Sequence, residues 1–395
     1  MMDKKVGVFT YVTLGMLTAF GPFVTDFYLP AMPEMVDFFH TSPSLVSMSL
    51  TTGMIGLAAG QIMIGPLSDK YGRKKLLVGS MALFCITSIL CIFAPNIVIF
   101  NACRLLQGFA GAGGIVLSKS ISTDMFSGKA LADFMAILGS INGIAPVVAP
   151  IVGGTMTNFT TWQGIFCMLI AICMILMICS MRLKETLKPE LRIRKPVIRL
   201  YGNLFKVFRN PRFTLCTLSI MLCFFTFFSY IASSPFIFQK IYGLTAFEFS
   251  LCFGLNAFMI VIGAALATRF HHQNTALKWG SIFLFCASLL VAVCQVLHAP
   301  LAVLMPCYVM LLMSFGLMQP VATAIALDSE RENAGAASAI FGASNFVAGA
   351  IASPIVALGN MLISSASMMV VGALGCLLLT VPLCGQVKKE QMAKL

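Results

Sequence analysis

The sequence has few charged residues, and very few of them interrupt its apolar segments. Asp, Glu, Lys and Arg make up 10% of the 395 residues, and 59% are hydrophobic. Soluble proteins typically contain about 25% charged residues. Common catalytic motifs are missing too: there is no phosphate-binding lysine loop, no H-E-x-x-H and no G-x-S-x-G. These absences argue against a soluble domain and give no reason to expect an enzyme.

The 14 cysteines do not form a recognisable site. No C-x-x-C occurs, and most cysteines lie in apolar stretches, where they act as small apolar residues. We therefore expect no metal site, no cofactor and no disulfide framework. The first apolar stretch is long for a secretory signal and no small-residue cleavage site follows it, so no signal peptide is expected.

Apolar runs of about 20 residues recur along the whole chain, and each can cross a ~30 Å bilayer core as a helix. Glycine and proline inside them do not argue against helix, because neighbouring helices can satisfy the freed backbone groups. We predict twelve transmembrane helices over 6–29, 45–66, 76–95, 97–118, 134–157, 163–182, 213–236, 248–270, 277–298, 301–326, 335–359 and 363–385.

The net charge of +12 indicates a membrane topology. If the N-terminus is inside, all 26 Lys and Arg except Arg104 and Lys240 fall on cytoplasmic segments. By the positive-inside rule, we expect both termini in the cytoplasm and the protein in the cell inner membrane. The lipid bilayer is therefore the expected partner, and a nucleic acid is not.

The longest polar segment, 183–212, divides six predicted helices from six. We predict an N-terminal bundle over 1–182, a basic cytoplasmic linker over 183–212, and a C-terminal bundle with a short tail over 213–395. The halves also resemble each other: Ala-Pro-Ile-Val at 149–152 returns as Ser-Pro-Ile-Val at 353–356. Parallel six-helix repeats with a site between them are a transporter architecture.

Asp26 and Arg104 are the only acid and base that the predicted helices hold well inside the membrane. A charge at bilayer depth costs at least ~2.5–3.5 kcal/mol, so such residues are rare and usually paired or functional. If the first helix continues to Pro33, both lie about seven residues from their outer helix ends. We expect the two side chains to pair. The alternatives are an arginine that snorkels outward and an aspartate that faces outer water.

Four segments resemble the major facilitator superfamily. Gly65-Pro-Leu-Ser-Asp69-Lys-Tyr-Gly72-Arg73 matches the G-x-x-x-D-x-x-G-R signature of the loop between its second and third helices. Gly72 permits a tight reversal, and Asp69 can accept hydrogen bonds from helix N–H groups. We expect this loop to act as a conformational latch; a plain positive-inside turn is the alternative.

Two further matches lie in spans four and five. Arg104-Leu-Leu-Gln107-Gly108 is similar to the R-x-x-Q-G signature of proton-coupled members, and Arg104 and Gln107 share a helix face. The fifth span is similar to the antiporter signature, although alanine replaces glycine at 136, 145 and 149. Its small residues predict close packing, which is also typical of any kinked, tightly packed helix. The residues of this motif are Gly139, Gly143, Pro146, Pro150, Gly153 and Gly154.

The fourth match, Asp26-Phe-Tyr28-Leu-Pro30-Ala-Met-Pro33, resembles the bicyclomycin and chloramphenicol resistance subfamily of drug:proton antiporters. The resemblance covers essentially the entire chain. It implies an all-α membrane protein with twelve transmembrane helices in two pseudo-symmetric six-helix bundles. It also implies a monomer that exports small, largely apolar drugs in exchange for protons, with Asp26 and Arg104 as the proton-coupling residues and no cofactor.

Other polar and aromatic residues inside the spans are candidates for a substrate cavity, although amides more often join helices and Phe often faces lipid. These candidates are Phe23, Tyr28, Gln107, Asn142, Tyr230, Asn256 and Asn345. Their neutral character favours apolar cargo over one defined metabolite, such as a sugar, amino acid or siderophore, which is the nearest alternative. A passive channel, or a membrane receptor or scaffold, is the alternative from another class; the glycine-rich spans and the repeats favour a carrier.

Overall fold

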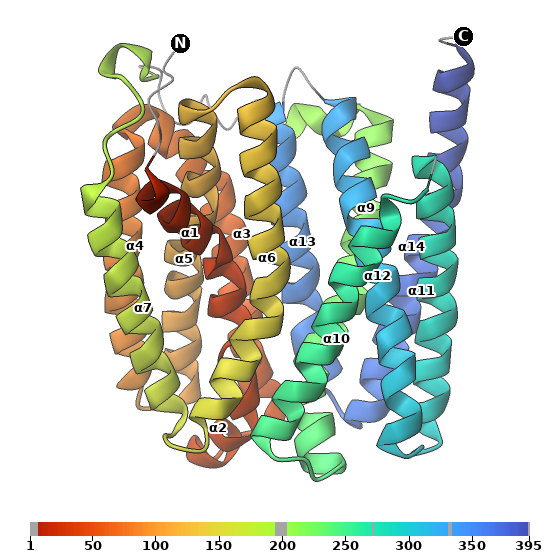
Figure 1. The fold of residues 1–395 in the computed structure, drawn as a ribbon. Helices are drawn as coiled ribbons and strands as arrows, with labels where there is room; N and C mark the ends of the chain where they lie inside the picture. Colours follow the sequence, from red (N-terminus) through yellow and green to blue (C-terminus); the bar gives the residue numbers. More distant parts are fainter. Residues whose placement is uncertain (1–6, 194–203, 271, 331–333, 394–395) are drawn as a thin grey trace. The chain divides into compact units, whose positions relative to one another are not determined.

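The structure, a computed structural model, describes residues 7–193, 204–270, 272–330 and 334–393. Nearly all of these residues are helical and none of them lies in a β-strand, which confirms the predicted all-α fold class (Figure 1). The chain divides into two compact units. The first consists of Met1–Thr41 and Thr52–Gly202, and the second of Ser42–Thr51 and Asn203–Leu395.

The helices follow one another with short connections. In the first half they are α1 (Val8–Asp26), α2 (Met32–Phe38), α3 (Pro43–Tyr71), α4 (Arg73–Ile92), α5 (Ile97–Met125), α6 (Gly128–Met156) and α7 (Trp162–Arg182). In the second half they are α9 (Pro211–Phe236), α10 (Ala246–Ala267), α11 (Gln273–Val296), α12 (Leu301–Ser329), α13 (Ala334–Val356) and α14 (Met361–Ala393). Short helical turns are η1 (Leu29–Ala31), η2 (Pro189–Leu191), η3 (Leu204–Arg209) and η4 (Ile237–Ile241).

Eleven helices in the described part of the chain are long and apolar enough to cross a membrane, with α1 and α2 counted as one span. Helix α5 is not among them, although it is 29 residues long. Its Arg104, Gln107 and several serine residues make it more polar than its neighbours. The twelve predicted spans therefore correspond to these eleven helices and α5.

The first span differs from its predicted course. A continuous helix through residue 29 was expected, whereas α1 ends at Asp26 and the chain continues through η1 into α2. Pro30 has no N–H to donate to the carbonyl of Asp26, and its ring would collide with that carbonyl in a continuing helix. The proline therefore places a break in the helix directly after the aspartate.

The two units repeat one pattern of helix packing. In the first, α1 packs on α5 and α6, and α4 packs on α5 and α7. In the second, α9 packs on α12 and α13, and α11 packs on α12 and α14. These are the same contacts between helices of the same rank in each half, so the predicted pseudo-symmetric bundles are present.

Glycines allow an equivalent close helix crossing in both bundles. A Cβ atom at Gly56 of α3 would overlap the carbonyl oxygen of Leu105 in α5. In the second bundle, a Cβ at Gly263 of α10 would overlap the carbonyl oxygen of Met313 in α12. Small residues let membrane helices approach until their backbones touch. Helix α5, which carries the arginine, is thereby held against α3.

Candidate functional site

Asp26 is the last residue of α1, and its carboxyl group is buried. Only 5% of the residue is exposed, and Oδ1 has no hydrogen-bond partner among the described residues. Buried polar groups are nearly always hydrogen-bonded, so an exception requires an explanation. The break after α1 therefore presents a buried carboxyl with one unsatisfied oxygen inside the first bundle.

The guanidinium of Arg104 is fully buried and reaches the end of α1 from α5. Its Nη2 donates to the carbonyl oxygen of Val24 at 2.9 Å, and its Nη1 donates to Oε1 of Gln107. Nε2 of Gln107 then donates to Oγ of Ser88 in α4 at 2.6 Å. A continuous chain of hydrogen bonds thus joins α1, α5 and α4.

Aromatic rings and a glycine enclose this guanidinium. Cζ of Arg104 lies 4.5 Å from the ring centroid of Tyr28 and 5.9 Å from that of Phe166, which are cation–π distances. A Cβ at Gly53 of α3 would lie 3.2 Å from Nη2, so the glycine leaves room for the cation. The alternative of an arginine that snorkels outward is excluded, since Arg104 is 0% exposed.

The expected pairing of Asp26 with Arg104 is not formed. Within the described residues no ion pair joins the two side chains, and the guanidinium contacts the Val24 carbonyl instead. The last four carbonyls of a helix lack intrahelical partners and carry partial negative charge, which stabilises a nearby cation. Val24 is among these four because α1 ends at Asp26. A first helix that continued to Pro33 would offer no free carbonyl there.

The antiporter-like motif packs against the same break. A Cβ at Gly153 of α6 would overlap the carbonyl oxygen of Phe27, the residue after Asp26. Any larger residue at this position would push α6 away from the end of α1. Around Gly153 the other motif residues vary in exposure: Pro150 and Gly154 are buried, Gly143 and Pro146 are half-buried, and Gly139 is exposed.

The second bundle has neutral polar contacts at the equivalent place. Nε2 of Gln295 in α11 donates to the hydroxyl of Tyr308 in α12 at 2.8 Å, and Tyr308 stands where the repeat places the arginine. Nδ2 of Asn256 in α10 donates to the hydroxyl of Tyr230 in α9 at 2.9 Å. The two tyrosine rings lie 4.9 Å apart and both are fully buried. A hydroxyl thus replaces the cation in this half.

The residues predicted to line a substrate cavity fall into two groups. Those that are fully buried in contacts within their own bundle are Tyr28, Gln107, Tyr230 and Asn256. The others are the half-buried Phe23, the exposed Asn142 and the buried Asn345. In the described part of the chain, Oδ1 of Asn256 and Oδ1 of Asn345 lack hydrogen-bond partners. Binding of a substrate by these residues remains a prediction.

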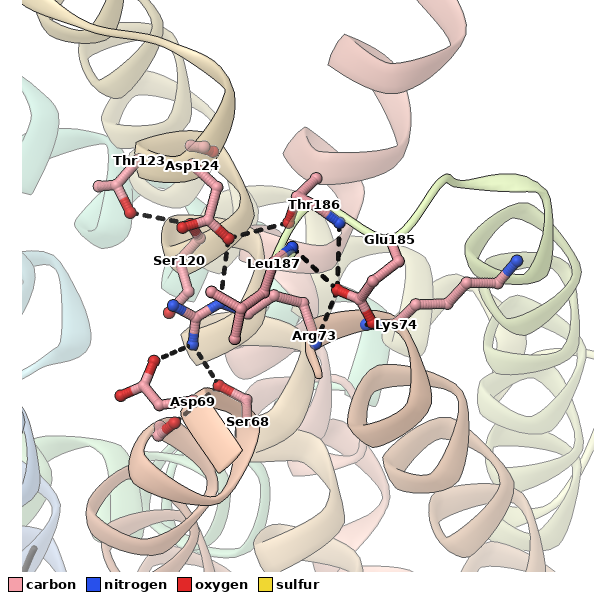
Figure 2. A network of polar contacts seen from close by, with 12 residues as sticks. Ser68, Asp69, Arg73, Lys74, Ser120, Thr123, Asp124, Glu185, Thr186 and Leu187 are labelled. Atoms are coloured by element: carbon pink, nitrogen blue, oxygen red, sulfur yellow. Dashed lines mark hydrogen bonds and ion pairs between the residues drawn. The ribbon is translucent and has the colours of Figure 1, made fainter. Parts of the chain in front are cut away.

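A second polar network surrounds the start of α4. Nη1 of Arg73 pairs with Asp69 at 2.5 Å and donates to Oγ of Ser68 at 2.6 Å, and Nε donates to Asp124 at 3.1 Å. Figure 2 shows the guanidinium between these three side chains. Gly72 has a φ of 100°, so the predicted tight reversal is present between α3 and α4. The network ties α4 to the ends of α3 and α5.

Glu185, which follows α7, caps the start of α4 (Figure 2). Its Oε1 accepts from the backbone N–H of Arg73 at 3.0 Å, and its Oε2 accepts from that of Lys74 at 3.3 Å. A carboxylate at a helix N-terminus satisfies orphan N–H groups and is favoured by the helix dipole. At the start of α4 the cap is thus Glu185, and Asp69 pairs with the Arg73 side chain. The expectation that Asp69 accepts bonds from helix N–H groups at the start of span eleven, near residue 333, lies outside the described residues and stays a prediction.

Asp124 and Glu185 were not among the predicted latch residues. Two weak signals pointed to them: Asp124 returns as Asp328 in the repeat, and Glu185 lies in the Lys-Glu-Thr segment after the sixth span. Gly65, which was predicted, contributes its carbonyl oxygen, which accepts from Oγ of Ser68 at 2.6 Å. Among the described residues, no group of three or more His, Cys, Asp or Glu side chains could hold a metal ion.

Comparison with known proteins gives consistent matches over most of the chain. Residues 14–353 match the family model described as Major Facilitator Superfamily. The uncharacterized MFS-type transporter YdgK of Bacillus subtilis is 35% identical over 88% of each chain. The bicyclomycin resistance protein homolog of Haemophilus influenzae is 27% identical over 96% of each chain. A D-xylose-proton symporter of known structure shares the fold with a TM-score of 0.73 at 14% identity, over 92% of this chain and 97% of that one.

Proposed function

The chain belongs to the major facilitator superfamily, and from this membership we propose that it exports small, largely apolar drugs in exchange for protons. The resemblance to the bicyclomycin and chloramphenicol resistance subfamily is confirmed, and the protein is a multi-pass membrane transporter. We place it in the cell inner membrane as a monomer that needs no cofactor. Both termini and the linker lie in the cytoplasm, in accordance with the distribution of basic residues.

The observation that carries this proposal is the buried carboxyl of Asp26 at the break after α1, whose Oδ1 has no hydrogen-bond partner among the described residues. An acid inside a membrane protein is retained at a free-energy cost, and such residues commonly belong to proton relays. Close packing of Gly153 on Phe27 keeps the break in place. We therefore assign the transported proton to Asp26.

Arg104 acts in this proposal as a positioning residue for the aspartate. Its guanidinium is bound to the Val24 carbonyl and to Gln107, so it holds the last turn of α1 against α5. Because these acceptors are neutral, the arginine keeps its contacts whether or not Asp26 carries a proton. The charge of Asp26 can then change without a loss of the bundle's structure.

Coupling follows from the cost of a buried carboxylate without a cationic partner. In the outward-facing state, outer water reaches ionised Asp26 and delivers a proton. The neutral side chain tolerates burial, so the protonated carrier can rock to face the cytoplasm. Binding of a drug there displaces the proton into the cytoplasm. The ionised site then favours the outward-facing state, in which outer water reaches it, so the drug-loaded carrier returns outward. Each cycle thereby exchanges drug for protons.

The network at the start of α4 serves as the conformational latch. Arg73 bridges Asp69 and Asp124, and Glu185 caps α4, so the ends of α3, α4 and α5 and the segment after α7 are held together. Charge-assisted hydrogen bonds of this kind are shorter and stronger than neutral ones, and they add geometric specificity. We expect this group to set the balance between conformations and to make no contact with the drug.

Substrate-induced proton release tests the proposal. Purified protein in weak buffer is screened against apolar antibiotics such as chloramphenicol and against sugars and amino acids, and the pH of the solution is recorded. We expect release with apolar antibiotics alone. Release with only a sugar or an amino acid would replace drug export by transport of that metabolite.

Asp26→Asn provides the residue-level test in vesicles with a proton gradient. We expect complete loss of uphill drug accumulation, with drug binding retained, because an amide resembles the protonated carboxyl. Asp133→Asn, which changes an exposed acid on α6, is the matched control and should transport normally. Uphill transport by Asp26→Asn would show that the proton is carried elsewhere.

A further inference from the structure

Two cysteines lie side by side where α11 and α12 are connected. Sγ of Cys294 is 3.8 Å from Sγ of Cys307. The residues that follow them, Gln295 and Tyr308, are joined by their own hydrogen bond of 2.8 Å. Two consecutive residue pairs therefore join the same two helices, next to a connection of only a few residues, 297–300.

The positions of the two cysteines in their helices explain why the thiols meet. Cys294 lies in the last turn of α11, and Cys307 lies in the second turn of α12. A helical Cα–Cβ bond tilts toward the N-terminus of its helix. Cys294 therefore leans away from the connection and Cys307 leans toward it. Small side-chain rotations can close the remaining gap to an S–S bond of about 2.05 Å.

This pair is more accessible than another thiol pair in the same bundle. Cys294 and Cys307 are each 9% exposed. Cys223 and Cys376 also contact each other, but both are 0% exposed and lie far from the ends of α9 and of the membrane span of α14. Since the first pair also lies near the ends of its helices, we expect a water-soluble oxidant to reach it more readily than the second. The two pairs thus form an internal comparison.

The first bundle repeats the arrangement at the connection of α4 and α5. The thiols of Cys91 and Cys103 are hydrogen-bond partners there, and Cys103 precedes Arg104 as Cys307 precedes Tyr308. Cys91 is 0% exposed and Cys103 is 8% exposed, so an oxidant reaches this pair less readily. A thiol pair at equivalent connections in both halves is a property of the repeat.

We propose that Cys294 and Cys307 are a redox modification site, which forms a reversible disulfide with disulfide-type oxidants on the outer side of the membrane. The outer location rests on the topology of the proposed function. One cysteine, as its thiolate, attacks the S–S bond of the oxidant and releases one thiol. The other cysteine then attacks the mixed disulfide and releases the second thiol. The pair loses two protons and two electrons, and the oxidant becomes two thiols.

The disulfide fixes the α11–α12 hairpin beside Tyr308. A cross-link between Cys294 and Cys307 restricts the unfolded chain, so the oxidised protein is more resistant to heat. It also keeps Gln295 opposite Tyr308 and so preserves their hydrogen bond. This bond stands where the first bundle has the hydrogen bonds of Arg104. Reduction restores the freedom of the hairpin.

Oxidation of the purified full-length protein tests the proposal. The protein is treated with oxidised glutathione, free thiols are alkylated, and mass spectrometry identifies the linked peptides. We expect Cys294–Cys307 to form before any other disulfide, to raise the Tm by several degrees and to reverse with dithiothreitol. Cys294→Ser and Cys307→Ser should each remove this rise. Cys286→Ser, at an exposed cysteine of α11, is the matched control and should keep it.

Two outcomes would overturn the proposal: folded protein that forms no Cys294–Cys307 disulfide, or a Cys223–Cys376 disulfide that forms equally fast. Membrane vesicles separate it from the transport hypothesis, because oxidised glutathione does not readily cross a bilayer. Oxidation in right-side-out vesicles alone supports the outer location, and oxidation in inverted vesicles alone refutes it. If right-side-out vesicles oxidise but show no drug–proton exchange, the modification site stands and the proposed function fails.

Discussion

The two bundles share their helix packing but differ in the polar groups at equivalent positions. In the first, the cation of Arg104 joins α1, α5 and α4 through a backbone carbonyl and neutral side chains. In the second, the hydroxyl of Tyr308 accepts from Gln295, and Gln295 Oε1 in turn accepts from Ser365 at 3.3 Å. Both chains are fully buried, yet only one contains a charge.

The difference shows that the shared packing does not require the charge. Glycine crossings hold α3 on α5 and α10 on α12 alike. Among the described residues, a buried carboxyl oxygen without a hydrogen-bond partner, Oδ1 of Asp26, occurs only in the bundle with the charged chain. A hydroxyl–amide pair is neutral at any physiological pH, so neither of its groups can bind and release the transported proton. We therefore expect proton coupling to depend on the first bundle, and we expect the two bundles to respond alike only to changes in packing.

The largest effects should come from the glycine crossings, equally in both bundles. Gly56→Ala and Gly263→Ala each bring a methyl group onto a backbone oxygen, which cannot move aside as a side chain can. Either variant should yield little monodisperse folded protein in size-exclusion chromatography. Gly79→Ala, where an added Cβ meets no described atom within 4 Å, is the control and should behave as wild type. If only one of the two variants lost its folded protein, the two helix crossings would not be equivalent.

The next largest effect should be that of Arg104→Ala in the first bundle. The Val24 carbonyl and Gln107 Oε1 lose their donor, and each unsatisfied buried group costs about 1–3 kcal/mol. Thermal unfolding in detergent should show a large fall in Tm. Arg104→Lys should recover part of it, because an ammonium can donate to the carbonyl but lacks the planar fork. If Arg104→Ala had the same Tm as wild type, the hydrogen bond from Arg104 to the Val24 carbonyl would not stabilise the end of α1.

Tyr308→Phe should have a smaller effect in the second bundle. It removes one neutral hydrogen bond with Gln295 and retains the ring, for a loss of about 1 kcal/mol. Proton-driven accumulation in vesicles should remain close to wild type. If this variant lost proton coupling as Asp26→Asn does, the coupling machinery would extend into both bundles.

The smallest effect should come from Arg212→Ala at the start of α9. Arg212 lies 3.9 Å from Asp328, whose side chain is 43% exposed, and such pairs contribute about 0–1 kcal/mol. Arg73→Ala is the comparison in the first bundle, where the residue is 8% exposed and bridges two carboxylates. In thermal unfolding, Arg73→Ala should lower the Tm clearly more than Arg212→Ala does. Equal losses would mean that the latch network is no stronger than this partly exposed pair, in which the Arg212 side chain is 15% exposed.

Much of the candidate site was visible in the sequence, but its contacts were not. The residue types at 26, 104 and 69–73 identified the two polar regions of the first bundle, since charges are rare in membrane spans. The predicted pairing of Asp26 with Arg104 is not formed, and no partner was predicted for Arg73. Glu185 lies 112 residues from Arg73, and its role as a cap could not be read from the spacing within one motif.

By itself, the sequence determined the helices, whereas the predicted first span ran past Asp26, where Pro30 ends α1. Long apolar runs require helices in a bilayer, because backbone groups must be satisfied internally, and Pro30 cannot donate to the carbonyl of Asp26. Only the tertiary structure decided which acceptor Arg104 would take. A carboxylate and a helix-end carbonyl both accept hydrogen bonds, and the choice depends on how α5 is rotated and how closely glycines let it approach α3. Residue spacing along one helix does not fix that rotation. The packing between helices therefore directs Arg104 to the Val24 carbonyl and leaves the Asp26 carboxyl without an ion pair.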